Sequence, residues 1–285
     1  MGLSVNKDTI CTLVGKETLR SQAMKYDAIV VGSGPNGLSA AITLQREGLR
    51  VLLLEAKQTI GGGMRTAELT QPGFLHDVCS AVHPMAAASP FFRTLPLHEF
   101  GLQYIIPEVL AAHPFDDGTA AALHRSIAET TASLGVDGPA YRRLFEPLVD
   151  AWPLIEGHIL GPMLKWPKNP LELSGFGLKL LQSGKQVASR FQTKQLRGLW
   201  SGIVAHSMIP LDALTSSAIG FVLTIAGHRG GWPIPVGGSQ RIADALAGYF
   251  QALGGTIHTD SPVTALSQLP ESKAVLFDTS PKQLL

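Results

Sequence analysis

The sequence predicts an α/β fold in which a parallel sheet, assembled from both ends of the chain, holds an inserted α+β domain. A short apolar run at 27–31, a glycine-rich turn, a helical segment at 38–46 and a second apolar run at 50–55 form a β-α-β unit. Further short strand candidates follow near the other end, at 256–258, 262–266 and 274–277. The long segment between them is mostly helical in pattern and is interrupted by prolines.

Composition excludes several classes of protein. The chain has 285 residues, with 23 Lys and Arg against 22 Asp and Glu, so its net charge of +1 excludes a broadly basic protein that binds nucleic acid. A hydrophobic fraction of 45% with only 16% charged residues excludes a disordered polymer. Two cysteines, Cys11 and Cys79, cannot form a disulfide framework, and no His or Cys spacing indicates a metal site. The sequence therefore predicts a cytoplasmic protein with a large core.

The pattern along the chain predicts a domain order. We expect a loose tail at 1–24, a nucleotide-binding domain built from 25–80 and 231–285, and an inserted substrate domain at 81–230. The insert begins with a hairpin of two strands, 109–115 and 119–124, around an Asp-Asp-Gly turn. Helices follow, with stops expected at Pro147 and Pro153, and one apolar stripe predicts a single helix over 173–191.

The last residues predict an incomplete element. Asp278 and Pro281 have the pattern of a capped helix start, yet the sequence ends at Leu285 after a single turn. One turn of helix is not stable alone, because nucleation costs more than one turn returns. We therefore expect that the sequence is a piece of a longer protein, without the carboxy-terminal part of its nucleotide-binding domain.

A Gly-x-Gly-x-x-Gly motif lies at the turn between the first strand and the first helix, in the run Gly32, Ser33, Gly34, Pro35, Asn36 and Gly37. Such a motif alone indicates little more than a glycine turn, but inside a β-α-β unit it is the arrangement that a dinucleotide needs. The first glycine permits the sharp turn, the second lets backbone approach the diphosphate, and the third lets helix and strand pack closely. The helix amino terminus then offers N–H groups to phosphate. This predicts a Rossmann-like domain.

Glu55 follows the second strand, 23 residues after Gly32. An acid at about this spacing binds the hydroxyl groups of the adenosine ribose, and its carboxylate repels a 2′-phosphate. The alternative is that Glu55 is simply an exposed charge at the end of a strand, which would not account for its spacing from the glycine motif upstream. NADP is therefore disfavoured, which leaves FAD or NAD.

The loop after Glu55 favours FAD. Its candidate cofactor-binding residues are Ala56, Gly61, Gly62, Gly63 and Arg65. An acid followed six residues later by a Gly-Gly pair resembles the second fingerprint of the two-dinucleotide-binding-domain flavoproteins, in which that backbone touches the diphosphate from its other side. Alone, the loop is also compatible with a flexible turn.

Together these motifs, with 72–74 and the loop 231–238, resemble the phytoene dehydrogenase-related flavoproteins, including their pyridine nucleotide-disulphide oxidoreductase domain-containing branch. The resemblance implies FAD, a substrate domain inserted into the FAD domain, and a lipophilic substrate of the isoprenoid or carotenoid-like kind that is oxidised, reduced or isomerised. It also implies that Val263 presents backbone to the adenine. Many members carry Arg directly after the Gly-Gly pair, where this chain has Gly63, so Arg65 is the candidate that neutralises phosphate. A flavin amine oxidase relative and a non-catalytic FAD-binding fragment are the alternatives.

No catalytic residue is assigned from the sequence. His76, His83 and His206 titrate in the range of proton-transfer groups, but a lone histidine is more often structural, and Asp77 has the same ambiguity. The segment 163–200 carries seven cations against one anion, interleaved with aromatic residues. Such a segment predicts either peripheral contact with anionic lipid or ordinary solvated helix faces.

Overall fold

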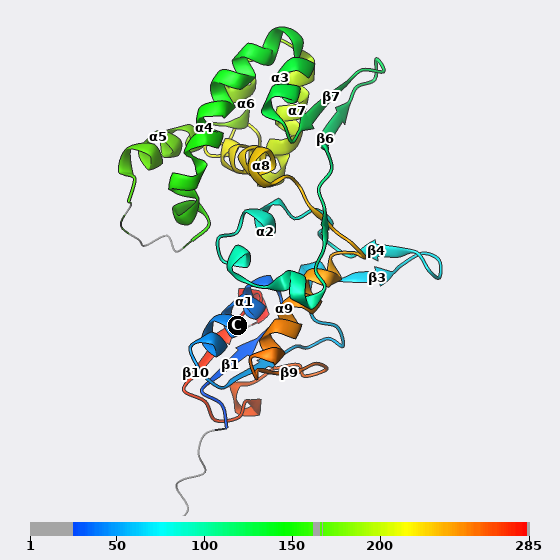
Figure 1. Cartoon of the computed structure of the whole chain (residues 1–285), viewed down its shortest axis with the longest axis vertical. Coiled ribbons are helices and arrows are strands. Elements are labelled where there is room, and N and C mark those ends of the chain that lie inside the picture. Colours follow the sequence, from blue (N-terminus) through cyan, green and yellow to red (C-terminus); the bar gives the residue numbers. More distant parts are fainter. Residues whose placement is uncertain (1–24, 162–165, 167, 284–285) are drawn as a thin grey trace, which may run out of the picture. The chain divides into compact units, whose positions relative to one another are not determined.

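The computed structural model describes residues 25–161, 166 and 168–283, so the expected tail and Cys11 lie outside the described residues (Figure 1). The chain forms two compact units: Met1–Arg65 with Ala243–Leu285, and Thr66–Ile242. The first unit thus combines two separate stretches of the chain, and its limits differ from the expected domain limits at 80 and 231. Residues 66–80 and 231–242 pack within the second unit, where Asp77 accepts a hydrogen bond from Ser239 N–H at 2.8 Å.

The first unit contains a four-stranded parallel sheet in the order β10-β1-β2-β9. Its strands are β1 (Ala28–Val31), β2 (Val51–Leu54), β9 (Thr256–His258) and β10 (Ala274–Phe277). Val31 pairs with both Leu54 and Phe277, so β1, β2 and β10 end at one level. The chain runs from β1 through β2 to β9 on one side of β1 and then places β10 on the other side. The carboxyl ends of β1 and β10 therefore meet at a topological switch point, where open α/β sheets bind ligands.

Burial explains why these segments are strands and helices. β1 and β2 are buried along their whole length, as continuous apolar runs in a parallel sheet require. Helix α1 (Pro35–Arg46) has proline at its first position and buries Leu38, Ala41 and Ile42. Helix α9 (Gln240–Ala252) runs beside α1, and Gln45 Nε2 donates to Leu253 O at 3.1 Å (Figure 1).

One expected strand in the first unit was wrong, and one expected helix start differs in its cap. Residues 262–266 form no strand and lead into a short 3₁₀ turn, η7 (Leu266–Gln268). Just before them, the N–H groups of Asp260 and Ser261 donate to backbone oxygens of the segment that follows β2. The helix start expected at Pro281 is present as a single 3₁₀ turn, η8 (Pro281–Gln283). Asp278 does not cap that turn, because its carboxylate bonds to helix α1 instead.

The second unit contains three two-stranded antiparallel pairs and a helical bundle. The pairs join β3 (Thr66–Glu68) to β4 (Leu75–Asp77), β5 (Tyr104–Ile105) to β8 (Ile234–Pro235), and β6 (Val109–Pro114) to β7 (Ala120–His124). The last pair confirms the predicted hairpin. The helices are α2 (Pro84–Ala88), α3 (Ile127–Ser133), α4 (Gly138–Ile159), α5 (Pro170–Leu180), α6 (Gly184–Ala188), α7 (Lys194–Val204) and α8 (Ser217–Gly230). Short 3₁₀ turns are η2 (Gly62–Met64, in the first unit), η3 (Phe92–Thr94), η4 (Leu97–Phe100), η5 (Gly135–Asp137) and η6 (Ala205–Ser207).

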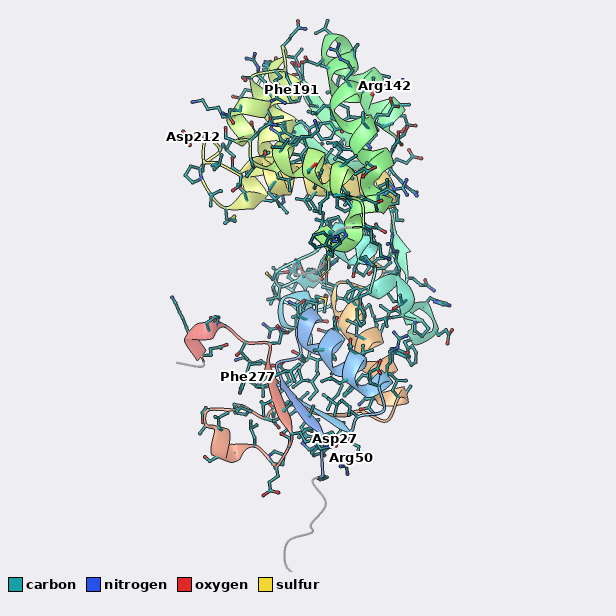
Figure 2. All side chains as sticks on the ribbon, turned by 90° about the vertical axis from the view of Figure 1, so that its left-hand side faces the viewer. Asp27, Arg50, Arg142, Phe191, Asp212 and Phe277 are labelled. Atoms are coloured by element: carbon teal, nitrogen blue, oxygen red, sulfur yellow. The ribbon has the colours of Figure 1, made fainter. Side chains whose placement is uncertain are left out.

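Aromatic side chains form the core of the helical bundle. The rings of Phe145, Trp200 and Phe221 lie 5.1 to 5.8 Å apart, and Trp152 packs edge-on against Phe176. Figure 2 shows the side chains of this unit, in which Phe191 is buried and Arg142 is exposed. Helix α4 continues through Pro147 and Pro153, so the predicted stops were wrong: each proline removes one backbone N–H, and burial of Leu148 and Trp152 between them keeps the helix intact.

The predicted single helix over 173–191 is divided in two. Helix α5 ends at Leu180, and Ser183 starts α6 with a capping box in which its hydroxyl accepts from Gln186 N–H. The apolar stripe was nevertheless correct about burial, since Phe176, Val187 and Phe191 are all buried. The sequence pattern predicts which residues face the core, but it does not predict a break between two helices that is stabilised by a local cap.

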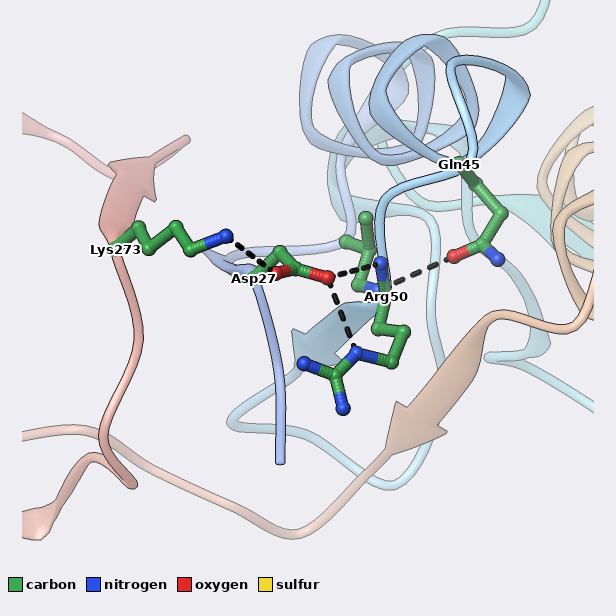
Figure 3. A network of polar contacts seen from close by, with 5 residues as sticks. Asp27, Gln45, Arg50 and Lys273 are labelled. Carbon is green, nitrogen blue, oxygen red and sulfur yellow. Dashed lines mark hydrogen bonds and ion pairs between the residues drawn. The ribbon is translucent and has the colours of Figure 1, made fainter. Parts of the chain in front are cut away.

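Asp27 connects the amino ends of three strands of the parallel sheet (Figure 3). Its carboxylate accepts from the Nε and backbone N–H of Arg50, at 3.1 and 3.0 Å, and from Lys273 Nζ at 3.0 Å. Arg50 precedes β2, and Lys273 precedes β10. The hydrogen bond from the Arg50 side chain is the main cause that holds the pKa of Asp27 well below its ordinary value of 3.8.

We expect Asp27→Asn to lower the urea midpoint of unfolding at neutral pH. A carboxyl group with a lowered pKa in the folded state stabilises that state fully above its unfolded pKa, and the stabilisation is lost as the pH falls through the folded value. Wild type and variant should therefore differ above pH 3.8 and converge below it. A difference that is the same at every pH would show that the charge of Asp27 is not the cause.

Candidate functional site

A cavity of about 780 Å³ opens at the carboxyl ends of β1, β2 and β10, entirely within the first unit. The last residues of the three strands, Val31, Leu54 and Phe277, line it. Its volume lies within the range of cofactor sites, about 300 to 1,000 Å³. The residues that follow these strands and β9 complete its wall: Gly32, Ser33, Gly34, Glu55, Ala56, Lys57, Gly62, Ser261, Pro262, Val263, Thr264, Asp278, Thr279, Ser280 and Gln283.

The glycine turn between β1 and α1 is tightly packed. Gly32 has a φ of +105°, and a Cβ there would lie 2.4 Å from the backbone oxygen of Asp278. A Cβ on Gly37 would lie 2.1 Å from Gly32 O, so the first and third glycines are required for the turn and its packing. Gly34, the residue before α1, supplies no side-chain cap.

Glu55 is directed at the glycine turn. Its Oε2 accepts from Ser33 N–H at 3.0 Å and from the Ser33 hydroxyl, and its Oε1 accepts from Lys57 N–H at 2.9 Å. A carboxylate has about four lone-pair positions. Oε2 therefore has both of its positions filled, and Oε1 keeps one for a further donor such as a ribose hydroxyl.

The Gly-Gly loop lies against the same turn. Gly61 N–H donates to the backbone oxygen of Ser33 at 3.0 Å and also approaches its hydroxyl at 3.2 Å. A Cβ on Gly62 would stand 3.1 Å from Gly34 Cα, so the two glycine segments are in contact. Arg65 does not line the cavity, but its Nε donates to Gly62 O at 2.9 Å, which holds its guanidinium beside the loop.

The structure brings together about half of the predicted cofactor residues. Gly32, Ser33, Gly34, Glu55, Ala56, Gly62 and Val263 line the cavity; Pro35, Asn36, Gly37, Gly61, Gly63 and Arg65 do not. Gly37 N–H is not directed at the cavity, because it donates to Asp278 Oδ2 at 2.7 Å. Sequence reasoning missed Lys57, the neighbours of Val263 and, after β10, Asp278, Thr279, Ser280 and Gln283. A signal was present: Asp278 follows an apolar strand in the same way that Glu55 does, and parallel strands share one carboxyl edge.

The second unit contains a smaller, mainly apolar cavity of about 240 Å³. It is lined by Val82, His83, Pro84, Met85, Ala86, His206, Leu223 and Trp232. The structure thus brings together His83 and His206, two of the three histidines considered from sequence. The third, His76, lies elsewhere, with its Nε2 2.8 Å from the hydroxyl of Thr70.

His83 is buried in a hydrogen-bonded setting. Its Nε2 lies 2.7 Å from Ser239 Oγ, and the Ser239 hydroxyl donates to Ser80 O at 2.6 Å. Since that hydroxyl hydrogen is used, Nε2 donates to Ser239 Oγ. Burial lowers the pKa of His83, so the ring is neutral at neutral pH. For Asp77, burial raises the pKa but hydrogen bonds from Thr66 and Ser239 outweigh it, so this carboxylate is structural.

A family model for flavin-containing amine oxidoreductases matches residues 36–283, most of the chain. The chain belongs to this family. Membership confirms FAD as the cofactor class and places the chain in a family of flavin-containing oxidoreductases, and it excludes neither a lipophilic nor an amine substrate. The predicted relation to phytoene dehydrogenases is not part of what this match shows.

The named relatives match different shares of the chain. A limonene dehydrogenase polypeptide of Castellaniella defragrans is 32% identical over 114 residues, 40% of this chain and 20% of that protein. Pyridine nucleotide-disulfide oxidoreductase domain-containing protein 2 of Mus musculus is 27% identical over 297 residues, 88% of this chain and 50% of that protein. The chain thus spans half the length, or less, of these relatives.

Solved structures confirm the fold. A crystallised protein of Pyrococcus furiosus superposes with a TM-score of 0.56 at 18% identity, over 90% of this chain and 60% of its own. A redesigned putrescine oxidase gives 0.51 at 20% identity, over 84% and 51%. Together with the parallel sheet, they confirm a Rossmann-like FAD-binding fold.

The residues at the larger cavity fit FAD. Oε1 of Glu55 has an acceptor position left, Gly34 and Gly62 line the cavity, and Thr279 Oγ1 is buried in the wall without a partner among the described residues. No group of three or more His, Cys, Asp or Glu in the described part of the chain could hold a metal ion. None of the described helices is long and apolar enough to cross a membrane.

We expect Gly34→Val to weaken FAD retention by about tenfold or more, because overpacking costs about 1 to 3 kcal/mol. A Cβ on Gly34 would lie 2.8 Å from Asp278 Oδ2, and the branched side chain would fill the turn against the second glycine loop. The measurement is the flavin content of purified protein and titration with FAD.

The control is Gly175→Val, since a Cβ there meets nothing within 4 Å. Thermal melting of both variants separates loss of binding from loss of folding. A Gly34→Val protein that retains flavin as wild type does would remove the glycine turn from the site.

Proposed function

We propose that this chain binds FAD in the larger cavity and that the protein uses it to oxidise or reduce a hydrophobic small molecule, as a dehydrogenase or desaturase. The observation that carries the proposal is the convergence of Glu55 and both glycine loops on one cavity at the switch point of the sheet. Bound FAD supplies the hydride acceptor or donor, while the protein positions the reactants and excludes water.

Each group at the cavity has a role in this proposal. Glu55 accepts a ribose hydroxyl on Oε1, and the backbone at Gly34 and Gly62 approaches the diphosphate from two sides. Arg65, held at Gly62 O, neutralises phosphate charge. Val263 lies in the wall next to Pro262 and Thr264, where its backbone is available to the adenine.

A hydrophobic substrate is supported by two observations. The limonene dehydrogenase polypeptide and a digeranylgeranylglycerophospholipid reductase of Methanococcoides burtonii, 35% identical over 121 residues, are named for terpene or isoprenoid compounds. The smaller cavity is mainly apolar and exceeds the ~150 Å³ that holds benzene in an engineered protein core. We include this cavity in the substrate-binding part of the protein, and a phytoene dehydrogenase-like relation remains part of the proposal.

The test is reduction of bound flavin under anaerobic conditions, followed by its visible absorbance, with cyclic and linear isoprenoid hydrocarbons as candidate substrates. We expect at least one of them to bleach the flavin of the protein after reconstitution with FAD. If reduced flavin is instead reoxidised by an isoprenoid alkene, the reaction runs as a reduction.

A matched variant tests the smaller cavity. Ala86→Phe fills it from α2 and should weaken flavin reduction by the hydrocarbon by about tenfold, since the phenyl ring takes space that the substrate needs and a loss of about 1.4 kcal/mol of apolar burial has this effect. FAD binding should be unchanged, because Ala86 lies in the other unit from the FAD cavity. Equal reduction of both proteins would exclude this cavity from substrate binding.

The second candidate function is amine oxidation, which the family match favours. Primary and secondary amines in the same assay distinguish it, because an amine oxidase reduces flavin with amines and not with hydrocarbons. Bound flavin that no member of either panel reduces or reoxidises would support the non-catalytic alternative.

We also propose that a cytoplasmic form of the protein makes peripheral contact with anionic membranes through helix α5. The structure corrects part of the basis for this idea: Phe176 and Trp200 are in the core, whereas Trp166 is 90% exposed. Lys165 lies outside the described residues. Helix α5 has a second apolar face, with Leu171 81% and Leu178 69% exposed, apart from the face that buries Phe176.

The cations of this segment divide into two groups. Lys194 pairs with Asp117, Arg190 donates to Gln182, and Arg197 donates to Phe191 O, so these three have partners within the protein. In the second group, the exposed cations Lys168 and Lys185 lie before and after α5, and the half-buried Lys179 lies on it. A lipid surface would cover the apolar face and attract these cations.

We expect flotation with anionic liposomes and much weaker flotation with neutral ones. Leu171→Ser combined with Leu178→Ser should abolish it, while Leu69→Ser, another exposed leucine outside α5, should not. High salt should reduce binding of the wild type. Absence of flotation with anionic liposomes at low salt would exclude membrane contact.

A further inference from the structure

Helix α1 lacks a cap of its own. Gly34 has no side chain to bond the first turn, and that turn contains no acidic residue. Helices usually satisfy their first N–H groups with a side chain at this position. In this chain the cap comes from far along the sequence: Asp278, which follows β10, accepts the Gly37 N–H on Oδ2 at 2.7 Å.

Asp278 is fixed in this place by its backbone. Its N–H donates to Val31 O at 2.8 Å, which extends the pairing of β1 with β10 by one residue. Its backbone oxygen lies 2.4 Å from the position of a Cβ on Gly32, and its Oδ2 lies 2.8 Å from that on Gly34 and 3.0 Å from that on Gly37. All three glycines of the motif therefore make room for one aspartate.

The same aspartate lines the cavity. The charged residues in the cavity wall are two carboxylates, Glu55 and Asp278, and one lysine, Lys57. Glu55 has hydrogen-bond partners that suit a sugar. Asp278 instead lies at the amino terminus of α1, which attracts anions such as phosphate. Its carboxylate therefore places a negative charge where the phosphate of a ligand would otherwise be attracted.

We propose that Asp278 is a positioning residue that caps helix α1 and limits the affinity of the cavity for diphosphate by electrostatic repulsion. This inference rests on the proposed FAD site. Because the Asp278 carboxylate accepts the hydrogen bond from Gly37 N–H, that group cannot bind the diphosphate. The backbone of Gly34 and the Gly62 loop bind it instead. The buried hydroxyl of Thr279, next in sequence, lines the same cavity without a partner among the described residues, so this wall has a donor left for a ligand.

The test compares ADP with adenosine, which share the base and sugar but differ in charge. Asp278→Asn keeps an oxygen for Gly37 N–H and removes the charge. We expect it to bind ADP about fivefold tighter than wild type at low salt, with adenosine affinity unchanged, because a unit charge a few ångströms away has about this effect at high dielectric. The gap should close at about 1 M salt, where the Debye length is about 3 Å. Calorimetric titration measures both ligands.

Two further variants separate charge from structure. Asp278→Ala removes the cap as well, so it should show a lower melting temperature than Asp278→Asn. Glu271→Gln makes the same change in net charge at an exposed position outside the cavity and should leave ADP affinity at the wild-type value.

The outcomes are distinguishable. If wild type binds ADP and Asp278→Asn binds it no more tightly, or if adenosine shows the same gain, the inference about Asp278 is wrong while the FAD site stands. If wild type binds neither ADP, adenosine nor FAD, the proposed function is wrong, and this inference with it.

Discussion

The proposed nucleotide site depends on the buried hydroxyl of Ser33, at the point where β1 turns into α1. This hydroxyl donates to Glu55, which follows β2, and lies 3.2 Å from Gly61 N–H in the Gly-Gly loop. Three segments that carry the fingerprint of the site are thus held by one fully buried side chain. A buried hydroxyl is costly to leave unsatisfied, so the three segments have a common reason to keep this arrangement.

Sequence patterns predicted what depends on local chain geometry. The β-α-β unit, the hairpin of β6 and β7 and the direction of Glu55 follow from periodicity, turn residues and the shared edge of parallel strands. They did not predict what depends on contacts far along the chain. Pro147 and Pro153 remain inside α4 because aromatic packing outweighs the loss of backbone N–H groups, and Asp278 caps a different helix from the one beside it.

The two cavities divide the chemistry between the units. The cavity in the first unit presents backbone and carboxylate groups, which suit a sugar and a diphosphate, whereas the cavity in the second unit presents Leu223, Trp232 and neutral His83. The hydrogen bond between His83 and Ser239 explains why this ring has a fixed orientation in an apolar setting. This division also explains why the sequence predicted the cofactor but not the substrate. The glycine loops have a fixed residue spacing that can be recognised in a sequence, whereas the residues of an apolar pocket have no fixed spacing.

Gly37 and Asp278, joined by one hydrogen bond, are 241 residues apart in the chain. Contacts with such long separation close late, because the entropy of a large loop must be overcome first. During translation, β1, α1 and β2 emerge early, but the wall of the larger cavity is complete only after Gln283 has left the ribosome. A nascent chain whose synthesis has reached only the inserted unit therefore has the glycine turn but not the residues after β10. If the larger cavity is the FAD site, FAD can bind there only after synthesis has passed that point.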